Sequence, residues 1–449
     1  MRTNIQIMAA AICLILAQTS GAAVTSEEAK ALGARLTPMG AERSGNRDNT
    51  IPAWDGGLKT PPACYKKEDG RLCDPFADEK PLFSINAGNM QKYEDRLSEG
   101  QKALLKRYPD YHMDVYPSHR TAALPQWLYE NTASNAVRAH TTDAGIGMQD
   151  ASAGVPFPIP KDGYEAMWNH LTRYQGQART LVSETYNVDA ADNVTFVLRN
   201  KILEDFPYYN TGKKSDADVL SRSRHYYIAP ARQAGWGIAW IDYINAASKG
   251  RRAWQYMPGQ RRVKLAPDLA FDTPGTQNAG AAFYDDIYMF NGSMERFDFK
   301  LVGKKELFVP YNTYKWGWTS AAKDILKPHF LNPDLMRWEL HRVWVIEATL
   351  KPGARHGYSK RRFYLDEDTW TALLNENYDG RGELWRTAVM NMTPNYDALA
   401  PAGTTHVYYD LVSGLYSSIS MLNGNKIDYL DPQPDAAFSP DALAGAGIR

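Results

Sequence analysis

Apolar and polar side chains alternate along the segment from Trp338 to Tyr378. Alternation with a period of two residues is typical of a strand that buries one face. In the first half of the segment the apolar residues share one parity: Trp338, Leu340, Trp344, Ile346, Ala348 and Leu350. Turn-forming residues at 351–353 and a polar stretch at 366–369 interrupt the alternation. The pattern predicts an antiparallel meander, around which we expect the rest of the chain to be organised.

The second strand of this meander has different side chains on its two parities. Phe363 and Leu365 are predicted to be buried. The opposite parity is predicted to be exposed: Lys360, Arg362 and Tyr364. The acidic stretch Asp366-Glu367-Asp368 that follows is predicted to be a solvent-exposed hairpin loop, because acidic residues favour turns. Two of these carboxylates could instead form a glycosidase pair, but their place in a turn favours the loop.

The same alternation begins at Gln177 and continues along most of the remaining chain. The predicted strands are 178–186, 194–204, 223–229, 237–244, 251–257, 261–265, 296–301, 306–309, 337–350, 357–365, 370–378, 384–393, 405–411 and 416–422. Helical spacing predicts helices at 26–36, 86–107 and 125–140, a further one after Asp162, and a short helical plug at 284–290. The predicted fold class is therefore mainly β, a large curved antiparallel sheet or open half-barrel with helices packed on it.

Four regions are expected along the chain. Residues 1–22 form a signal peptide, and residues 23–176 an extended and helical region that packs on the sheet. Residues 177–435 form the half-barrel, and residues 436–449 a C-terminal tail. The charges balance, with 51 basic and 51 acidic residues, which argues against nucleic acid as a partner.

The amino terminus has the pattern of a secretory signal peptide. Arg2 supplies the charge, an apolar run extends from Ile5 to Ala17, and small residues at 20–22 precede a cleavage site near Ala22 or Ala23. The apolar run is shorter than a membrane span, and no later stretch is long and uncharged enough to cross a bilayer as a helix. We therefore expect an exported, soluble protein of the periplasm.

Removal of the signal peptide leaves the cysteines Cys64 and Cys73. An even, closely spaced pair in an exported chain predicts a structural disulfide, and two free thiols are the alternative. Closing so short a loop stabilises the fold by ~2–3 kcal/mol in the chain-entropy treatment.

The sequence contains no motif of a known catalytic or metal centre such as HExxH, CxxC or GxSxG, and we predict no metal or cofactor. His170 is interpreted as a packed or capping group rather than a ligand. The other polar candidates lie on separate elements and would meet only in space: Asp285, Asp286, His225, His341, His356 and His406. Basic pairs at 251–252 and 261–262 and the triplet at 360–362 are interpreted as outward-facing sheet surface, or as a rim that contacts an acidic headgroup or partner.

Several long motifs resemble a known family. They include GVPFPIPKDGYEAMWNHL, RRAWQYMPGQRRV and PHFLNPDLMRWELHRVWVIEATLKPGARHGYSKRRFYLDEDTW. With the segment LTPMGAERSGNRDNTIPAWDGGL, they resemble the bacterial domain of unknown function 1329 family from about Leu36 to Leu430. The resemblance implies a sheet similar to that of the periplasmic lipoprotein-sorting carriers, an open half-barrel of the lipoprotein-localisation type. It also implies a transporter of the resistance-nodulation-division type and an outer-membrane β-barrel as partners, and no catalytic residues.

The leading functional hypothesis is a non-enzymatic periplasmic carrier of a hydrophobic, lipid-like molecule in a Gram-negative envelope. A curved sheet with large residues on its inner parity would form an apolar trough. The residues predicted to line it are Trp240, Trp254, Trp344, Ile346, Phe363 and Leu365. The alternatives are that these residues fill a core, or that carboxylates or histidines in the same trough make a periplasmic hydrolase. An outer-membrane barrel is disfavoured by the long helical stretches before Gln177 and by charges on both strand parities.

Overall fold

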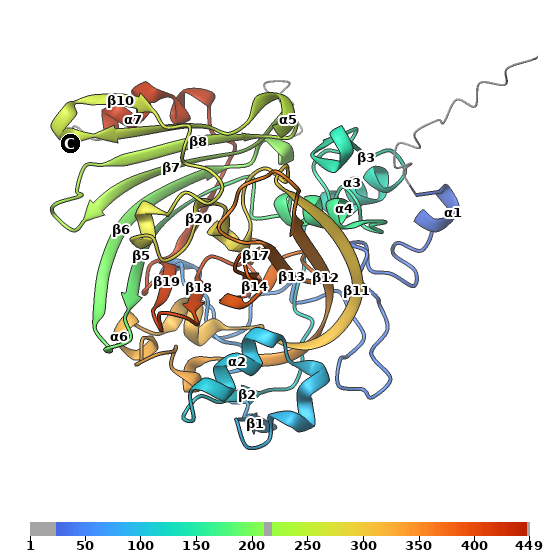
Figure 1. Cartoon of the computed structure of the whole chain (residues 1–449). Helices are drawn as coiled ribbons and strands as arrows, with labels where there is room; N and C mark the ends of the chain where they lie inside the picture. Colours follow the sequence, from blue (N-terminus) through green and yellow to red (C-terminus); the bar gives the residue numbers. More distant parts are fainter. Residues whose placement is uncertain (1–23, 211–217, 447–449) are drawn as a thin grey trace, which may run out of the picture.

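One large, strongly curved sheet organises the molecule (Figure 1). The structure is a computed structural model and describes residues 24–210 and 218–446. The predicted signal peptide, residues 1–22, lies outside the described residues. Among the helices of the described part of the chain, none has the length and apolar character needed to span a membrane.

The main sheet is antiparallel from one end to the other, apart from a short parallel contact at its margin. In spatial order its strands are β11 (Phe297–Pro310), β12 (Trp338–Leu350), β13 (Lys360–Asp366), β14 (Ala372–Tyr378), β15 (Leu384–Met390), β18 (His406–Asp410), β19 (Tyr416–Met421), β5 (Ala178–Val188), β6 (Val194–Asp205), β7 (Val219–Ala229), β8 (Gly237–Tyr243), β9 (Arg252–Met257) and β10 (Arg262–Leu265). No pairing joins β10 to β11 within the described residues, so the sheet is open there. The predicted fold class, a large curved antiparallel sheet with helices packed on it, is confirmed.

Shorter strands complete the architecture. β20 (Ile427–Leu430) pairs with the first residues of β5, and β1 (Phe83–Ile85) pairs with β2 (Met113–Val115), which meets the start of β12. Two small hairpins stand apart from the main sheet: β3 (His140–Thr142) with β4 (Gly147–Gln149), and β16 (Thr393–Asn395) with β17 (Ala400–Ala402).

The predicted meander is present, and its register pairs two of the residues predicted to be buried. Ile346 of β12 pairs with Phe363 of β13. The two strands predicted at 296–301 and 306–309 are in fact the single strand β11, because a bulge between Leu301 and Gly303 lets pairing with β12 continue across the polar residues.

Both faces of the meander are buried, which corrects the prediction of one buried face. The inner, concave face bears Ile346 and Phe363, whereas the outer face bears Val345 and Tyr364. Tyr364, predicted to be exposed, is buried, and Leu340 belongs to the outer core. The alternation is weak here because additional elements cover the outer face and apolar residues are then needed on both parities.

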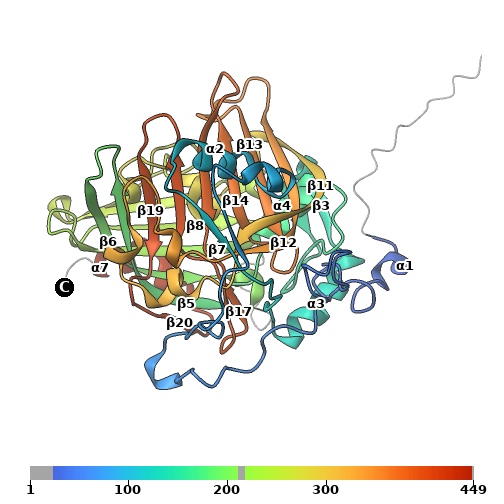
Figure 2. The ribbon, with the colours of Figure 1, turned by 90° about the horizontal axis from the view of Figure 1, so that it is seen from below.

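The helices are shorter than predicted, and they cover both faces. They are α1 (Ser26–Ala29), α2 (Glu99–Arg107), α3 (Gln126–Ala136), α4 (Gly163–Leu171), α5 (Ala246–Lys249), α6 (Ala322–Ile325) and α7 (Pro440–Ala446), with 3₁₀ turns that include η2 (Met90–Arg96) and η7 (Tyr284–Met289). The helix predicted at 86–107 is divided into η2 and α2, because Ser98 and Gln101 form a capping box that starts a new helix. Figure 2 shows α2 on the outer side of the sheet, where it packs on β14 and β15.

The remaining packing positions the functional region. On the inner face, α4 contacts β11 and β12, and η7, the predicted helical plug, contacts β14, β15 and β18. On the outer face, α7 packs on β8, β9 and β10 with Leu443 fully buried, so the predicted C-terminal tail includes a packed helix. The predicted disulfide between Cys64 and Cys73 is present.

Candidate functional site

A cavity of about 220 Å³ opens on the inner face of the sheet beside β7 and β8. Its rim includes the exposed residues Gly250, Pro267 and Glu295. Its inner end is formed by buried side chains, among them Arg173 and Tyr288. The apolar part of the wall comes from α4, the strands and the 267–271 loop: Trp168, Leu171, Phe206, Leu220, Trp240 and Phe271.

Backbone conformation helps to shape this cavity. Tyr288 and Met289 have positive φ values of 53° and 74°, and they end η7 with a sharp reversal that places both side chains in the inner core. Gly292, at φ 139°, lies in the cavity wall in a region of conformational space that favours glycine. The segment from η7 to β11 thus folds back over the inner face and closes one side of the cavity.

Most of the charged groups around the cavity are paired. Arg251 Nε lies 2.7 Å from Asp242 Oδ1. Arg222 Nη2 lies 3.1 Å from Asp205 Oδ2. Beyond the wall, Arg179 Nε lies 2.6 Å from Glu204 Oε2, and the Tyr288 hydroxyl donates to Glu204 Oε1 at 3.0 Å. These pairs neutralise one another because each guanidinium faces a carboxylate in a buried, weakly screened setting.

Arg173 is different, because no carboxylate of the described residues lies within ion-pair distance of it. Its side chain is buried, with the residue 6% exposed. Nη1 donates to the carbonyl of His170 at 2.8 Å, and Nη2 donates to Gln175 Oε1 at 3.4 Å. Burial and the neighbouring Arg179 lower the pKa of Arg173 to about 10. The guanidinium therefore stays charged at neutral pH while it lacks a counter-ion.

The histidines near the inner face are neutral and add no charge. Burial lowers the pKa of His170 well below its usual value. Burial also lowers the pKa of both His225 and His406 to about 4. At the inner end of the cavity, the two arginines Arg173 and Arg179 are accompanied by a single carboxylate of the described residues, that of Glu204, which pairs with Arg179. One excess positive charge remains there.

A serine, a histidine and an asparagine form the arrangement closest to a catalytic one. Ser223 Oγ, in the cavity wall, lies 2.9 Å from His225 Nε2, and His225 Nδ1 lies 2.9 Å from Asn200 Nδ2. The amide nitrogen is a donor, so Nδ1 accepts and Nε2–H donates to the serine oxygen. An imidazole in this tautomer cannot remove the proton of the serine, and this argues against a nucleophilic hydrolase.

The structure separates the six residues that are predicted to line the trough. Trp240 lies in the cavity wall. Trp254 is on the outer face under α7, because its partner in the β8–β9 register is Ala239 rather than Trp240. The other four share the inner face as predicted but belong to the apolar core beneath α4 and η7: Trp344, Ile346, Phe363 and Leu365. A ligand-binding role for these residues stays a prediction.

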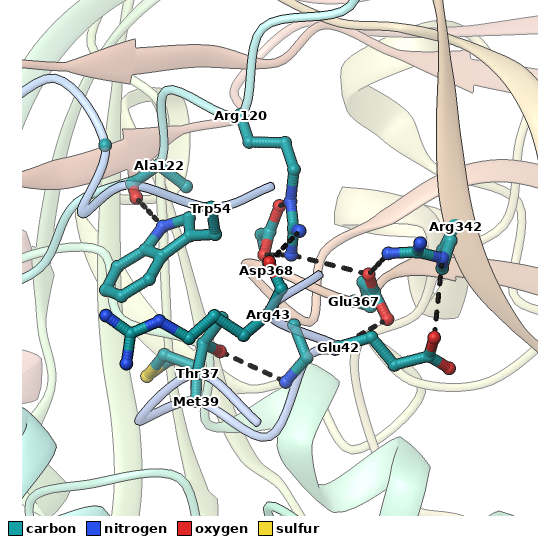
Figure 3. Close-up of polar contacts among 12 residues, drawn as sticks. Thr37, Met39, Glu42, Arg43, Trp54, Arg120, Ala122, Arg342, Glu367 and Asp368 are labelled. Atoms are coloured by element: carbon teal, nitrogen blue, oxygen red, sulfur yellow. Dashed lines mark hydrogen bonds and ion pairs between the residues drawn. The ribbon is translucent and has the colours of Figure 1, made fainter. Parts of the chain in front are cut away.

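The acidic stretch Asp366-Glu367-Asp368, with Thr369, is buried, and the prediction of a solvent-exposed loop is wrong. We call these four residues the acidic turn. Arg120 donates to both carboxylate oxygens of Asp368, at 2.8 and 2.7 Å, and Arg342 Nη1 lies 3.2 Å from Glu367 Oε1. Figure 3 shows how the N-terminal segment closes over the turn, with the backbone N–H of Glu42 donating to Glu367 at 3.2 Å. Cations from distant segments compensate the acidic residues and allow their burial.

The acidic turn also brings His341 close to Asp366 and Asp368, in a group whose ligand atoms lie within 4.8 Å of one another. The donors are already occupied, however. The hydroxyl of Thr369 donates to Asp366 at 2.7 Å, Arg120 donates to Asp368, and His341 Nε2 lies 3.1 Å from Glu339 Oε2. A cation placed here would also face two nearby arginines. These residues fit a charge-balanced structural core better than a metal site.

Arg361 is buried, so the interpretation of the 360–362 triplet as outward-facing surface is wrong at its centre. Its Nη1 lies 3.0 Å from Asp285 Oδ2, and its Nη2 lies 2.8 Å from Asp286 Oδ1. His356 Nε2 lies 3.0 Å from the same oxygen of Asp285. The candidates Asp285, Asp286 and His356 thus meet in space as parts of an ion-pair network that fastens η7 to the sheet.

Comparison with known proteins identifies the family. The sequence profile of the family described as "Protein of unknown function (DUF1329)" matches residues 84–444. The chain belongs to the DUF1329 family. The uncharacterized protein PA3922 of Pseudomonas aeruginosa is 42% identical over 446 residues, which cover 97% of this chain and 96% of that protein.

Solved structures with part of the same fold include a DUF1329 family protein from Desulfovibrio piger, at 15% identity and a TM-score of 0.44, covering 63% of this chain and 97% of that chain. A putative outer membrane lipoprotein-sorting protein domain from Vibrio parahaemolyticus has 14% identity and a TM-score of 0.44, and the match covers 63% of this chain and 98% of that chain. The LolA superfamily protein NE2245 from Nitrosomonas europaea has 13% identity and a TM-score of 0.38, and the match covers 63% of this chain and 100% of that chain.

Sequence analysis missed the polar residues at the inner end of the cavity of this DUF1329 protein. Arg173 follows a predicted helix, where a basic residue is expected as an ordinary partner of the helix dipole. Glu204 and Tyr288 lie at the ends of separate elements. No local pattern indicates that these three residues meet, or that one of the two buried arginines lacks a counter-ion.

Proposed function

We propose that this DUF1329 protein is a non-enzymatic carrier that binds a lipid-like molecule in the periplasm of a Gram-negative cell. The observation that supports it best is the cavity of about 220 Å³ on the concave face of the sheet, with a largely apolar wall. Cavities that enclose drug-sized ligands measure ~300–1,000 Å³. This smaller cavity suits a single apolar chain, or the leading part of a larger lipid.

The partners follow from the same proposal. A carrier in the periplasm must receive its cargo at one membrane and deliver it at the other. We propose that a transporter of the resistance-nodulation-division type and an outer-membrane β-barrel protein, the partners implied by the family resemblance, occupy the two ends of that route.

Among the predicted lining residues, we propose that Trp240 touches the ligand directly. Its indole is in the cavity wall, packed against His225 at a centroid distance of 4.7 Å. The proposed role of the other five is to hold the curvature of the sheet from either face: Trp254, Trp344, Ile346, Phe363 and Leu365.

A cavity-filling variant tests the proposal. Ala246 lies in the cavity wall at the start of α5, and its neighbour Ala247 is exposed. In delipidated protein, Ala246→Trp is expected to weaken binding of an uncharged fluorescent alkyl probe, N-dodecyl dansylamide, by roughly tenfold or more, because the indole occupies the space of several methylene groups. Ala247→Trp is expected to bind like the parent. Fluorescence titration measures both variants, and thermal melting verifies that they are folded.

The outcome that contradicts the carrier proposal is clear. If the delipidated parent shows no saturable binding of the alkyl probe, or if the two tryptophan variants bind it equally, the cavity is not a binding site for apolar chains.

A hydrolase is tested on the same protein with p-nitrophenyl esters. Because the tautomer of His225 cannot take the proton of Ser223, we expect no ester hydrolysis that depends on this serine. Any hydrolysis by the parent should therefore be unchanged in Ser223→Ala.

A further inference from the structure

We propose that the cargo is a single-chain amphiphile with an anionic head, and that Arg173 binds this head at the inner end of the cavity. The inference deepens the proposed function and rests on it. It names the class of ligand, a carboxylate or phosphate at the end of one apolar chain, and it assigns the residue that selects this ligand from uncharged lipids.

The first argument is the charge of the site. Three other arginines around the cavity face carboxylates at 2.6–3.1 Å: Arg179, Arg222 and Arg251. Arg173 contacts a carbonyl oxygen, an amide oxygen and the ring face of Tyr288, 5.4 Å from the ring centroid, but no carboxylate of the described residues, and it lies beside another cation, Arg179. An isolated buried charge is costly unless it is paired. An uncompensated guanidinium in a cavity wall is therefore a ready partner for an anion that enters the cavity.

The second argument is that the surroundings provide no internal anion as a substitute. Glu204, which also lines the cavity, is already bonded to Arg179 and to the hydroxyl of Tyr288. Asp242 is held by Arg251 through two bonds of 2.7 and 2.9 Å. Within the described residues, the excess positive charge at Arg173 remains for a ligand to neutralise.

The third argument is the direction of the cavity. Arg173 is buried at the inner end, and the exposed residues Gly250, Pro267 and Glu295 form the rim. Apolar side chains line the space between them, including Leu220, Trp240 and Phe271. An amphiphile that enters head first would thus place its anion on Arg173 and its chain along the apolar wall. Glu295 on the rim would disfavour the reverse orientation by repelling the head.

The fourth argument is the chemistry of the guanidinium. Its planar set of N–H donors matches the two oxygens of a carboxylate or phosphate, and such charge-assisted bonds are roughly twice as strong as neutral ones. The contacts with His170 and Gln175 use only two of its five N–H groups and hold the side chain in one orientation. Arg173 is thus preorganised to bind an anionic head.

The experiment measures displacement of bound N-dodecyl dansylamide by three competitors of equal chain length. Laurate and dodecyl phosphate distinguish the two sources of the anion, and dodecanol is the uncharged reference. We expect at least one anion to displace the probe from the parent at roughly tenfold lower concentration than dodecanol, because a charge-assisted bond is formed. In Arg173→Gln this preference is expected to disappear, while the exposed control Arg252→Gln keeps it.

A second measurement, thermal melting, distinguishes loss of the anion site from misfolding of the variant. Because Arg173 has no counter-ion, Arg173→Met is expected to melt at or above the temperature of the ligand-free parent. Arg179→Met leaves Glu204 unpaired and is expected to melt lower. A melting temperature of Arg173→Met well below that of the parent would overturn the proposal that its charge is uncompensated.

The outcomes separate the two levels of the hypothesis. Without saturable binding of the uncharged probe to the parent, the carrier function itself fails. With probe binding but equal displacement by laurate, dodecyl phosphate and dodecanol, only the anionic head is refuted. A preference for anions that survives in Arg173→Gln would refute the role of Arg173.

Discussion

Replacement of Arg361 by methionine is expected to lower the free energy of unfolding by about 3–5 kcal/mol, as for other buried ion pairs that lose one partner. Arg361 is 0% exposed in side chain, and its two terminal nitrogens face Asp285 and Asp286 at 3.0 and 2.8 Å. Without the guanidinium, two adjacent carboxylates remain in the core with much less compensation. Urea denaturation of the purified protein, followed by tryptophan fluorescence, measures the loss.

The next residue along β13 is a matched control. Arg362 is partly exposed and lies 2.7 Å from Glu347 and 4.0 Å from Glu376, so Arg362→Met is expected to cost clearly less than Arg361→Met. If Arg361→Met does not fold, adding Asp285→Asn and Asp286→Asn should restore folding, because the unpaired charges are then gone. A single Arg361→Met variant as stable as Arg362→Met would show that the network does not hold η7 to the sheet.

The largest pH effect is expected at Asp366 in the acidic turn. Burial and the neighbouring Asp368 raise the pKa of Asp366 to about 7, whereas an unfolded aspartate has a pKa of about 3.9. Between these values the folded state holds a proton that the unfolded state has lost. The free energy of unfolding therefore falls as the pH rises, by up to about 1.4 kcal/mol per pH unit from this group. Below a pH of about 3.9 the group is protonated in both states, so its contribution no longer changes with pH.

The substitution Asp366→Asn isolates this effect, because an amide cannot ionise. Compared with the parent, the variant should show a smaller loss of stability between pH 5 and pH 8, measured by urea denaturation at each pH. Asp368→Asn serves as the contrast, since it weakens the paired bonds to Arg120 and should destabilise the protein at every pH in this range. Parallel stability curves for the parent and Asp366→Asn would contradict the assignment.

Two of the corrected predictions share a cause. Local patterns place Asp368 and Arg361 at the surface because charged side chains are rarely buried. That rule holds unless compensating charges are near, and here they come from remote parts of the chain. Arg120 is 248 positions before Asp368, and Asp286 is 75 positions before Arg361. A local pattern contains no information about such partners.

By itself, the sequence determined the features that depend on near neighbours. The period of two residues located most strands and placed Ile346 and Phe363 on the inner face, because alternation follows from backbone geometry alone. Close spacing in a chain expected to be exported predicted the bond between Cys64 and Cys73. The long motifs similarly pointed to the DUF1329 family, whose profile matches residues 84–444.

The tertiary structure alone decided which side chains line a cavity and which fill a core. Trp240 reaches the cavity and Phe363 does not, although both lie on inner-face parities, because α4 and η7 pack on one part of the sheet and leave space beside β7 and β8. The unpaired charge of Arg173 likewise results from the way other arginines take the buried carboxylates around the cavity, with Glu204 bonded to Arg179 and Asp242 to Arg251. Such properties depend on packing among distant elements, whose contacts are set by the whole fold rather than by any stretch of sequence.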